Sequence, residues 1–131
     1  MHGLDTNVLV RYLVSDDKKQ AARAKVFIEK HCTDEHPGFI NVIVLCELTW
    51  VLAGAYKQSR AVIYKVIDQL LATAQLEIMD ADLVLMALKE YKDSKAQFAD
   101  HLIAHVNAGR GHLETITFDQ VAAKTSFFKQ I

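Results

Sequence analysis

The 131-residue chain is predicted to form one α/β domain, residues 1–131, a three-layer α/β/α sandwich with a short-stranded, mainly parallel central sheet. Short apolar segments alternate with longer ones in which apolar residues recur every three or four positions, the spacing of amphipathic helices. No hairpin turn joins the short segments, so the strands are expected to run parallel, with helices on both faces. A hydrophobic content of 51% is ample for one core.

Capping and turn residues divide the first half of the chain. Thr6 or Asn7 can cap the first helix, residues 15–17 can cap the second, and Asn41 can cap the third. The only proline, Pro37, marks a turn before the second strand. The expected elements are strand 1–4, helix 8–13, helix 18–32 with a basic outer side, strand 39–40, helix 42–55 and helix 60–72.

The second half repeats this alternation of strands and helices. Asp80 can cap a helix that follows a short strand, and the glycines within residues 109–111 stop a later helix. The expected elements are strand 76–79, helix 82–92, helix 98–108, strand 113–117 and a short terminal helix over 121–128. No internal repeat and no glycine-rich phosphate loop is found.

Composition excludes several classes of protein. The formal net charge is -1 with 24% charged residues, so any contact with nucleic acid must come from a local basic patch. Cys32 and Cys46 lie in apolar or helical segments without CxxC spacing, which indicates reduced, buried thiols. No apolar segment approaches the ~20 residues of a membrane span, and no signal sequence is recognised. We therefore expect a soluble, cytoplasmic protein.

Four carboxylates interrupt apolar segments. Asp5 follows the first strand and Asp119 follows the last, so both are expected at the carboxyl edge of the sheet, where open α/β folds bind ligands. Glu47 is the only charge in a helix that is apolar nearly all round, which predicts a buried helix with Glu47 in a polar pocket. Asp100 lies near a helix start, where the helix dipole favours an anion.

These four acids predict a metal site if they share one crevice. Carboxylates at such close range cannot all stay ionised without a cation. Oxygen ligands suit Mg²⁺ or Mn²⁺, and pairs of such ions ~4 Å apart recur in nucleases. The pattern therefore favours metal-assisted hydrolysis of a phosphodiester.

Taken together, the segments around these acids resemble the four acidic motifs of the PIN-domain family. They are Leu4-Asp5-Thr6-Asn7-Val8-Leu9, the Glu47 helix with its Glu-Leu pair, Phe98-Ala99-Asp100 followed by Leu102-Ile103-Ala104, and Thr117-Phe118-Asp119. The similarity covers nearly the whole chain and is closest to VapC-type toxins of type II toxin-antitoxin modules. It implies a PIN-like fold, an endoribonuclease dependent on Mg²⁺ or Mn²⁺, an RNA substrate, a homodimer and a small antitoxin partner. Relative to the family, the chain is expected to stop short of the usual terminal strand.

The resemblance also implies roles for individual residues. The acids that would hold the metal, directly or through water, are Asp5, Asp100 and Asp119. Glu47 would complete the catalytic set by orienting the attacking water or holding a second ion. Neighbouring side chains would fix the orientation of these carboxylates by donating hydrogen bonds, namely Thr6, Asn7 and Thr117.

Other polar and aromatic residues allow more than one interpretation. Basic residues that could track an RNA backbone, or could simply form a solvated face, are Arg11, Lys18, Lys19 and Arg110. Trp50 and Tyr56 could stack on bases, but packing in the core or a dimer is favoured. His101 and His105 lie four residues apart without an HExxH pattern or a cysteine partner, so surface or capping positions are favoured over zinc ligation.

Two functions from different classes stay open. The first is the metal-dependent ribonuclease, and the second is a non-cutting PIN-like module that binds nucleic acid together with an antitoxin. Retention of all four acids favours the enzyme, because a binding scaffold does not need them. A haloacid-type phosphotransferase with Asp5 as nucleophile is disfavoured, since Asn7 stands where a second Asp would act as general acid.

Overall fold

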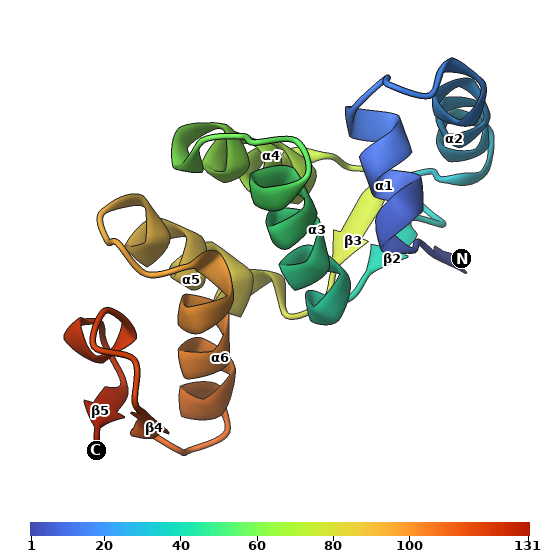
Figure 1. The fold of residues 1–131 in the computed structure, drawn as a ribbon. Coiled ribbons are helices and arrows are strands. Elements are labelled where there is room, and N and C mark those ends of the chain that lie inside the picture. Colours follow the sequence, from blue (N-terminus) through green and yellow to red (C-terminus); the bar gives the residue numbers. More distant parts are fainter.

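The computed structural model describes residues 1–131 and has the predicted α/β class, with helices packed around a short parallel sheet in a three-layer arrangement (Figure 1). Its elements are β1 (His2–Gly3), α1 (Thr6–Leu13), α2 (Lys18–His31), β2 (Gly38–Ile40), α3 (Val42–Gly54), α4 (Arg60–Ala72), β3 (Leu76–Ile78), α5 (Ala81–Lys92), α6 (Phe98–Gly109), β4 (Thr115–Thr117), the 3-10 helix η1 (Ala122–Lys124) and β5 (Phe128–Gln130). The two termini lie at opposite ends of an elongated molecule (Figure 1).

The strands form two separate parallel sheets rather than one. The first has the order β1-β2-β3, and the second contains only β4 and β5. In Figure 1 the second sheet lies at the far end of the molecule from β1. The single central sheet expected from the alternation of elements is therefore divided, because β4 pairs with β5 and not with β1.

The hydrophobic core lies beneath the first sheet and extends into the helices. Ile40 on β2 is 0% exposed, and Ile78 on β3 lies beside it in the parallel register. Leu45 and Leu48 fill the core from α3, and Phe98 extends it to the start of α6. Most positions predicted as helix are helical, because apolar residues at three- and four-residue spacing pack one face into this core.

Three predictions about local structure are wrong. The terminal helix expected over 121–128 is one 3-10 turn followed by β5, since Thr125 has an extended backbone (φ -101°, ψ 170°) that ends helical geometry, and Phe127 has a positive φ of 69°. The chain consequently does have a terminal strand. The cap of α1 is neither Thr6 nor Asn7 but Asp5, whose carboxylate accepts a hydrogen bond from the Thr6 backbone N–H. Asp80 occupies its predicted cap position, but in left-handed geometry without a side-chain hydrogen bond.

The helix that carries Glu47 is not buried all round, contrary to the prediction. One side of α3 packs into the core through Leu45 and Leu48. The opposite side is open, with Ile43 68% and Trp50 54% exposed on either side of the exposed Glu47. These three residues share one helix face by their four- and three-residue spacing. An apolar sequence thus gives a helix with one uncovered apolar face.

Candidate active site

Asp5 lies at the junction of β1 and α1, as predicted, and its carboxylate is exposed. Its Oδ1 accepts a hydrogen bond of 2.8 Å from the Thr6 backbone N–H. The residue has an extended backbone (φ -84°, ψ 161°) as the N-cap of α1, so the helix start both orients the carboxylate and favours its charge.

Glu47 is joined to this junction by a side-chain hydrogen bond. The buried Thr6 hydroxyl donates to Glu47 Oε1 across 3.0 Å, which links the start of α1 to the middle of α3. Asp5 and Glu47 are therefore both anchored through Thr6, one by its backbone and the other by its side chain. Asn7 is exposed and lines a pocket of about 500 Å³ between α1 and α2.

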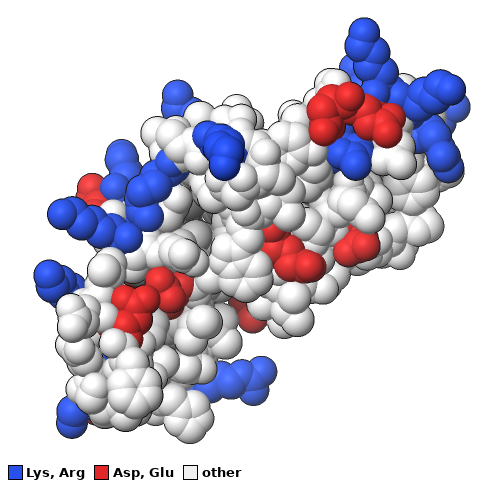
Figure 2. All heavy atoms as spheres, viewed as in Figure 1, with Lys and Arg blue, Asp and Glu red and all other residues white.

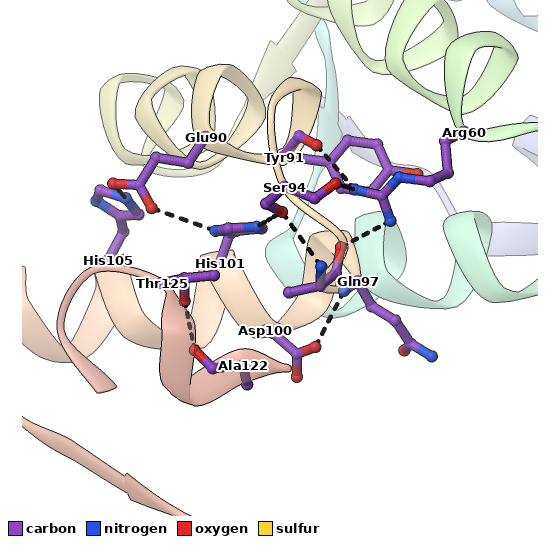
Figure 3. A network of polar contacts seen from close by, with 11 residues as sticks. Arg60, Glu90, Tyr91, Ser94, Gln97, Asp100, His101, His105, Ala122 and Thr125 are labelled. Carbon is purple, nitrogen blue, oxygen red and sulfur yellow. Dashed lines mark hydrogen bonds and ion pairs between the residues drawn. The ribbon is translucent and has the colours of Figure 1, made fainter. Parts of the chain in front are cut away.

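Asp100 is half-buried in the first turn of α6, as predicted. Its Oδ2 accepts a hydrogen bond of 3.0 Å from the backbone N–H of Gln97, an interaction drawn in Figure 3. The Asp100 backbone N–H in turn donates to the Gln97 backbone carbonyl across 3.1 Å, so the two residues bond reciprocally at the helix start. Asp100 thus uses one carboxylate oxygen to stabilise its own helix start.

Asp119 follows β4 and is exposed. Its Oδ1 accepts hydrogen bonds from the backbone N–H groups of Val121 (2.8 Å) and Ala122 (3.1 Å). The Thr117 hydroxyl accepts a bond of 2.9 Å from the Asp119 backbone N–H, so Thr117 fixes the turn rather than the carboxylate itself. Like Asp5, Asp119 lies two residues after a parallel strand, and its carboxylate accepts backbone N–H bonds from the turn that follows.

The four acids do not form one cluster within a single chain. No group of three or more His, Cys, Asp or Glu side chains is arranged to hold a metal ion. Asp5 and Glu47 adjoin the first sheet, whereas Asp119 follows a strand of the second. Acidic side chains on the face shown in Figure 2 also form small separate groups. The carboxylates of one chain therefore do not fit a Mg²⁺ or Mn²⁺ site, and their catalytic roles stay predictions.

The predicted basic residues lie in two places. Lys18 and Lys19 are exposed at the start of α2, near Arg11, whereas Arg110 follows the end of α6. Arg11 is already engaged, because its guanidinium forms an ion pair of 3.2 Å with Asp16. Figure 2 shows lysine and arginine side chains gathered over α2 and, separately, toward the other end of the molecule. A single basic patch is absent from this face.

A buried polar cluster joins α5 to α6, and the sequence interpretation missed it. His101 and His105 are buried rather than at the surface, and both approach the Glu90 carboxylate, at 3.2 and 3.1 Å (Figure 3). A carboxylate only accepts hydrogen bonds, so His101 Nδ1 donates to Glu90 and its Nε2 accepts from the Ser94 hydroxyl across 2.6 Å. His105 Nε2 lacks hydrogen-bond geometry despite its short distance. Burial lowers the pKa of His101, although Glu90 opposes this shift.

Arg60 at the start of α4 is a second residue that the sequence interpretation missed. Its guanidinium donates to the backbone carbonyls of Ala96 (2.7 Å), Tyr91 (2.8 Å) and Ser94 (2.9 Å), as Figure 3 shows. It also stacks 4.0 Å from the centre of the Tyr91 ring. Arg60 therefore fastens the turn between α5 and α6 to α4. The spacing of five histidines and acids along α5 and α6 offered a signal for the histidine cluster, but no sequence pattern indicated the contacts of Arg60.

Comparison with known proteins assigns the family. A family model described as PIN domain matches residues 4–127, which is nearly the whole chain. A search of curated proteins finds no match. None of the helices has the length and apolar character that crossing a membrane requires. PIN domains are generally metal-dependent nucleases, so the match indicates a nuclease-type function that involves nucleic acid. The predicted resemblance is thus confirmed at the level of the family, and the chain belongs to the PIN-domain family.

Proposed function

We propose that this protein is an endoribonuclease that hydrolyses RNA phosphodiester bonds with Mg²⁺ or Mn²⁺, and that it is the toxin of a type II toxin-antitoxin pair. The main support for this proposal is the match to the PIN-domain family over residues 4–127, which contains all four acids in order. We further propose a small antitoxin as its partner, a homodimer as its assembly and the cytoplasm as its location. The two free cysteines, Cys32 and Cys46, are compatible with a reducing compartment.

The proposal gives each acid a role that its local setting supports. Asp5, Asp100 and Asp119 are the proposed metal ligands, and each uses a carboxylate oxygen to accept a backbone N–H bond that restrains its rotation. Glu47 is the proposed acid that orients water, and the Thr6 hydroxyl holds one of its oxygens. One chain does not place three or more acidic side chains where they could hold an ion together, so it provides no complete metal site.

Contacts with RNA are proposed at basic residues of α1 and of the start of α2. Lys18 and Lys19 are exposed and free to reach phosphate groups. Arg11 is held by Asp16 and by Gln20 Oε1, which accepts from Nε across 2.6 Å. It therefore has less freedom to bind a phosphate than the lysines, and Arg110 would have to bind a separate part of the RNA.

The central test compares the wild type with Asp5→Asn on RNA in Mg²⁺, Mn²⁺ and EDTA. Asn keeps the oxygen that caps α1 but removes the charge, so the protein should fold while cleavage falls on the order of 100-fold or more. Asp68→Asn removes an exposed acid from α4 and is the matched control, with cleavage expected at the wild-type rate. Equal cleavage by wild type and Asp5→Asn would contradict the proposed roles.

The toxin role has its own test. Expression of the wild type should arrest growth of a bacterial host, and Asp5→Asn should not. Co-expression of a small protein encoded beside this chain should restore growth and co-purify with it. Arrest by both proteins would contradict a toxin that acts by cleavage.

The separation of the acids within one chain favours a second candidate, the non-cutting PIN-like binding module. This candidate predicts that wild type and Asp5→Asn retain RNA equally in a filter-binding assay and that neither cleaves it with either metal. Cleavage by the wild type that stops in EDTA would eliminate the binding module as the sole function.

A further inference from the structure

Strand β1 of the first sheet and strand β4 of the second each leave one edge unpaired. The Leu4 N–H donates to Phe39 on β2, so the alternate residue Gly3 directs its N–H and C=O away from β2. The Thr115 N–H donates to Phe127 beside β5, and Ile116 therefore directs its backbone groups away from β5. Both open edges belong to parallel sheets, and open edges readily pair with another strand.

The second sheet also lacks a core of its own. Within residues 110–131, Ala122 is the only buried residue. On and beside β4, Ile116 is 53% and Phe118 is 79% exposed. Apolar side chains exposed next to an open strand edge indicate a surface that becomes covered.

One register of a parallel pairing between β1 and β4 would bring Asp5 and Asp119 side by side. If Gly3 pairs with Thr117, its N–H and C=O meet the outward C=O of Ile116 and N–H of the residue at 118. Counting two residues along each strand brings Asp5 level with Asp119. Neighbouring strands lie ~4.8 Å apart, so the two carboxylates would become neighbours at the carboxyl edge of one sheet.

The same chain does not bring its own β4 to its own β1. Helix α5 packs on α4, and α6 adjoins α3. Arg60 fastens the turn between α5 and α6 to α4 through three carbonyl oxygens. In Figure 1, α6 leads β4 away from β1 to the opposite end of the molecule. The open edge of β1 is thus left for a strand from another chain.

We infer that the occupant is a second copy of this chain: β4 of each copy pairs with β1 of the other, and Asp119 of one copy joins Asp5 and Glu47 of its partner. The pairing is self-complementary, because each copy offers both edges and a two-fold axis satisfies both at once. It yields two composite sites per dimer. Only the catalytic role of the shared acids rests on the proposed function. The strand pairing is tested without any measurement of RNA cleavage.

Covalent capture tests the pairing directly. Gly3→Cys and Thr117→Cys are placed in one chain with Cys46→Ala, since Gly3 has open space for a Cβ and Cys32 is buried. Mild oxidation should give a species of twice the chain mass in a denaturing gel, because adjacent strands meet the geometry of a disulfide. Gln130→Cys in place of Thr117→Cys is the control, since β5 lies one strand farther from β1 and should not be captured.

Each result decides the question. A disulfide within one chain, without a species of doubled mass, would overturn the inference by showing that β4 closes on its own β1. The same holds if no disulfide forms and light scattering of the unmodified protein gives the mass of one chain. If the disulfide-linked dimer forms but the protein does not cleave RNA, the strand pairing is supported and the proposed function is contradicted.

A proline at the open edge provides a second variant. Ile116→Pro removes an N–H that faces away from β5, so the β4–β5 ladder is preserved while the outer edge loses a donor. The mass by light scattering should fall twofold, to that of one chain, whereas Ile116→Thr should keep the dimer. A dimer that survives Ile116→Pro with unchanged dissociation would contradict pairing through β4.

Where the protein cleaves RNA, mixing of two inactive variants identifies the shared site. Asp5→Asn and Asp119→Asn each impair both sites of a homodimer. After mixed refolding, roughly a quarter of the wild-type rate should return, since half of the dimers are mixed and one of their two sites is intact. No recovery from a mixture shown to contain mixed dimers would overturn the sharing of Asp119.

Discussion

The two sheets of this protein use the same local pattern with different results. In each, an Asp lies two residues after a parallel strand and accepts a backbone N–H bond from the next turn, Asp5 after β1 and Asp119 after β4. The first sheet lies on the core, and Ile40 within it is 0% exposed. The second exposes Ile116 at 53%. Strand pairing and capping are thus sufficient for local geometry, but only packed apolar residues make a sheet self-supporting.

The strongest test of this contrast compares one isoleucine from each sheet. Ile40→Ala should lower the free energy of unfolding by about 2 to 5 kcal/mol, because it leaves a cavity in the core. Ile116→Ala should change it by only about 0.5 kcal/mol in urea titrations on dilute, monomeric protein. If a second copy covers β4, the loss in unfolding free energy caused by Ile116→Ala should grow toward that of Ile40→Ala as the protein concentration rises. Equal losses in the monomer would contradict the contrast.

The attachment of α5 and α6 to α4 should be the next most sensitive feature. Arg60→Lys keeps the charge but cannot reach three carbonyl oxygens at once or stack flat on Tyr91. We expect a loss of about 1 to 3 kcal/mol in urea unfolding, since carbonyl groups lose charged donors. Arg23→Lys on the exposed side of α2 is the matched control and should be nearly neutral. A neutral Arg60→Lys would show that apolar packing alone holds α5 on α4.

The histidine cluster should make stability depend on pH. Burial lowers the folded-state pKa of His101 below its ordinary 6.5, against the opposing influence of Glu90 and Asp100 and with a smaller lowering from His105. The unfolded chain therefore binds the proton more readily, and stability should be complete above pH 6.5 and fall as the pH drops below it. Urea unfolding at several pH values should show a shallower fall in His101→Gln. An unchanged slope in that variant would assign the pH dependence to other groups.

The sequence predicted the elements better than their assembly. Helix 60–72 was predicted at its observed bounds, because its apolar residues repeat with helical spacing and Ser59 caps it. The separation of Asp119 from Asp5 could not be predicted, since it depends on which strand β4 pairs with, a contact between residues far apart in sequence. Apolar composition likewise could not show that Ile43 and Trp50 lie on an uncovered face.

Asp5 itself supplies the smallest effect. Its Oδ1 caps α1 by accepting the Thr6 N–H, and its charge is not part of a group of three or more acids arranged around an ion. Asp5→Ala should therefore cost about 1 kcal/mol in thermal or urea unfolding, whereas Asp5→Asn should cost less because the amide oxygen still accepts the Thr6 N–H. If Asp119 of a second copy lies beside Asp5, the effect of Asp5→Asn depends on the protein concentration, because the second copy is bound only at high concentration. Asp5→Asn should then strengthen association in the absence of metal, because one of two adjacent charges is removed.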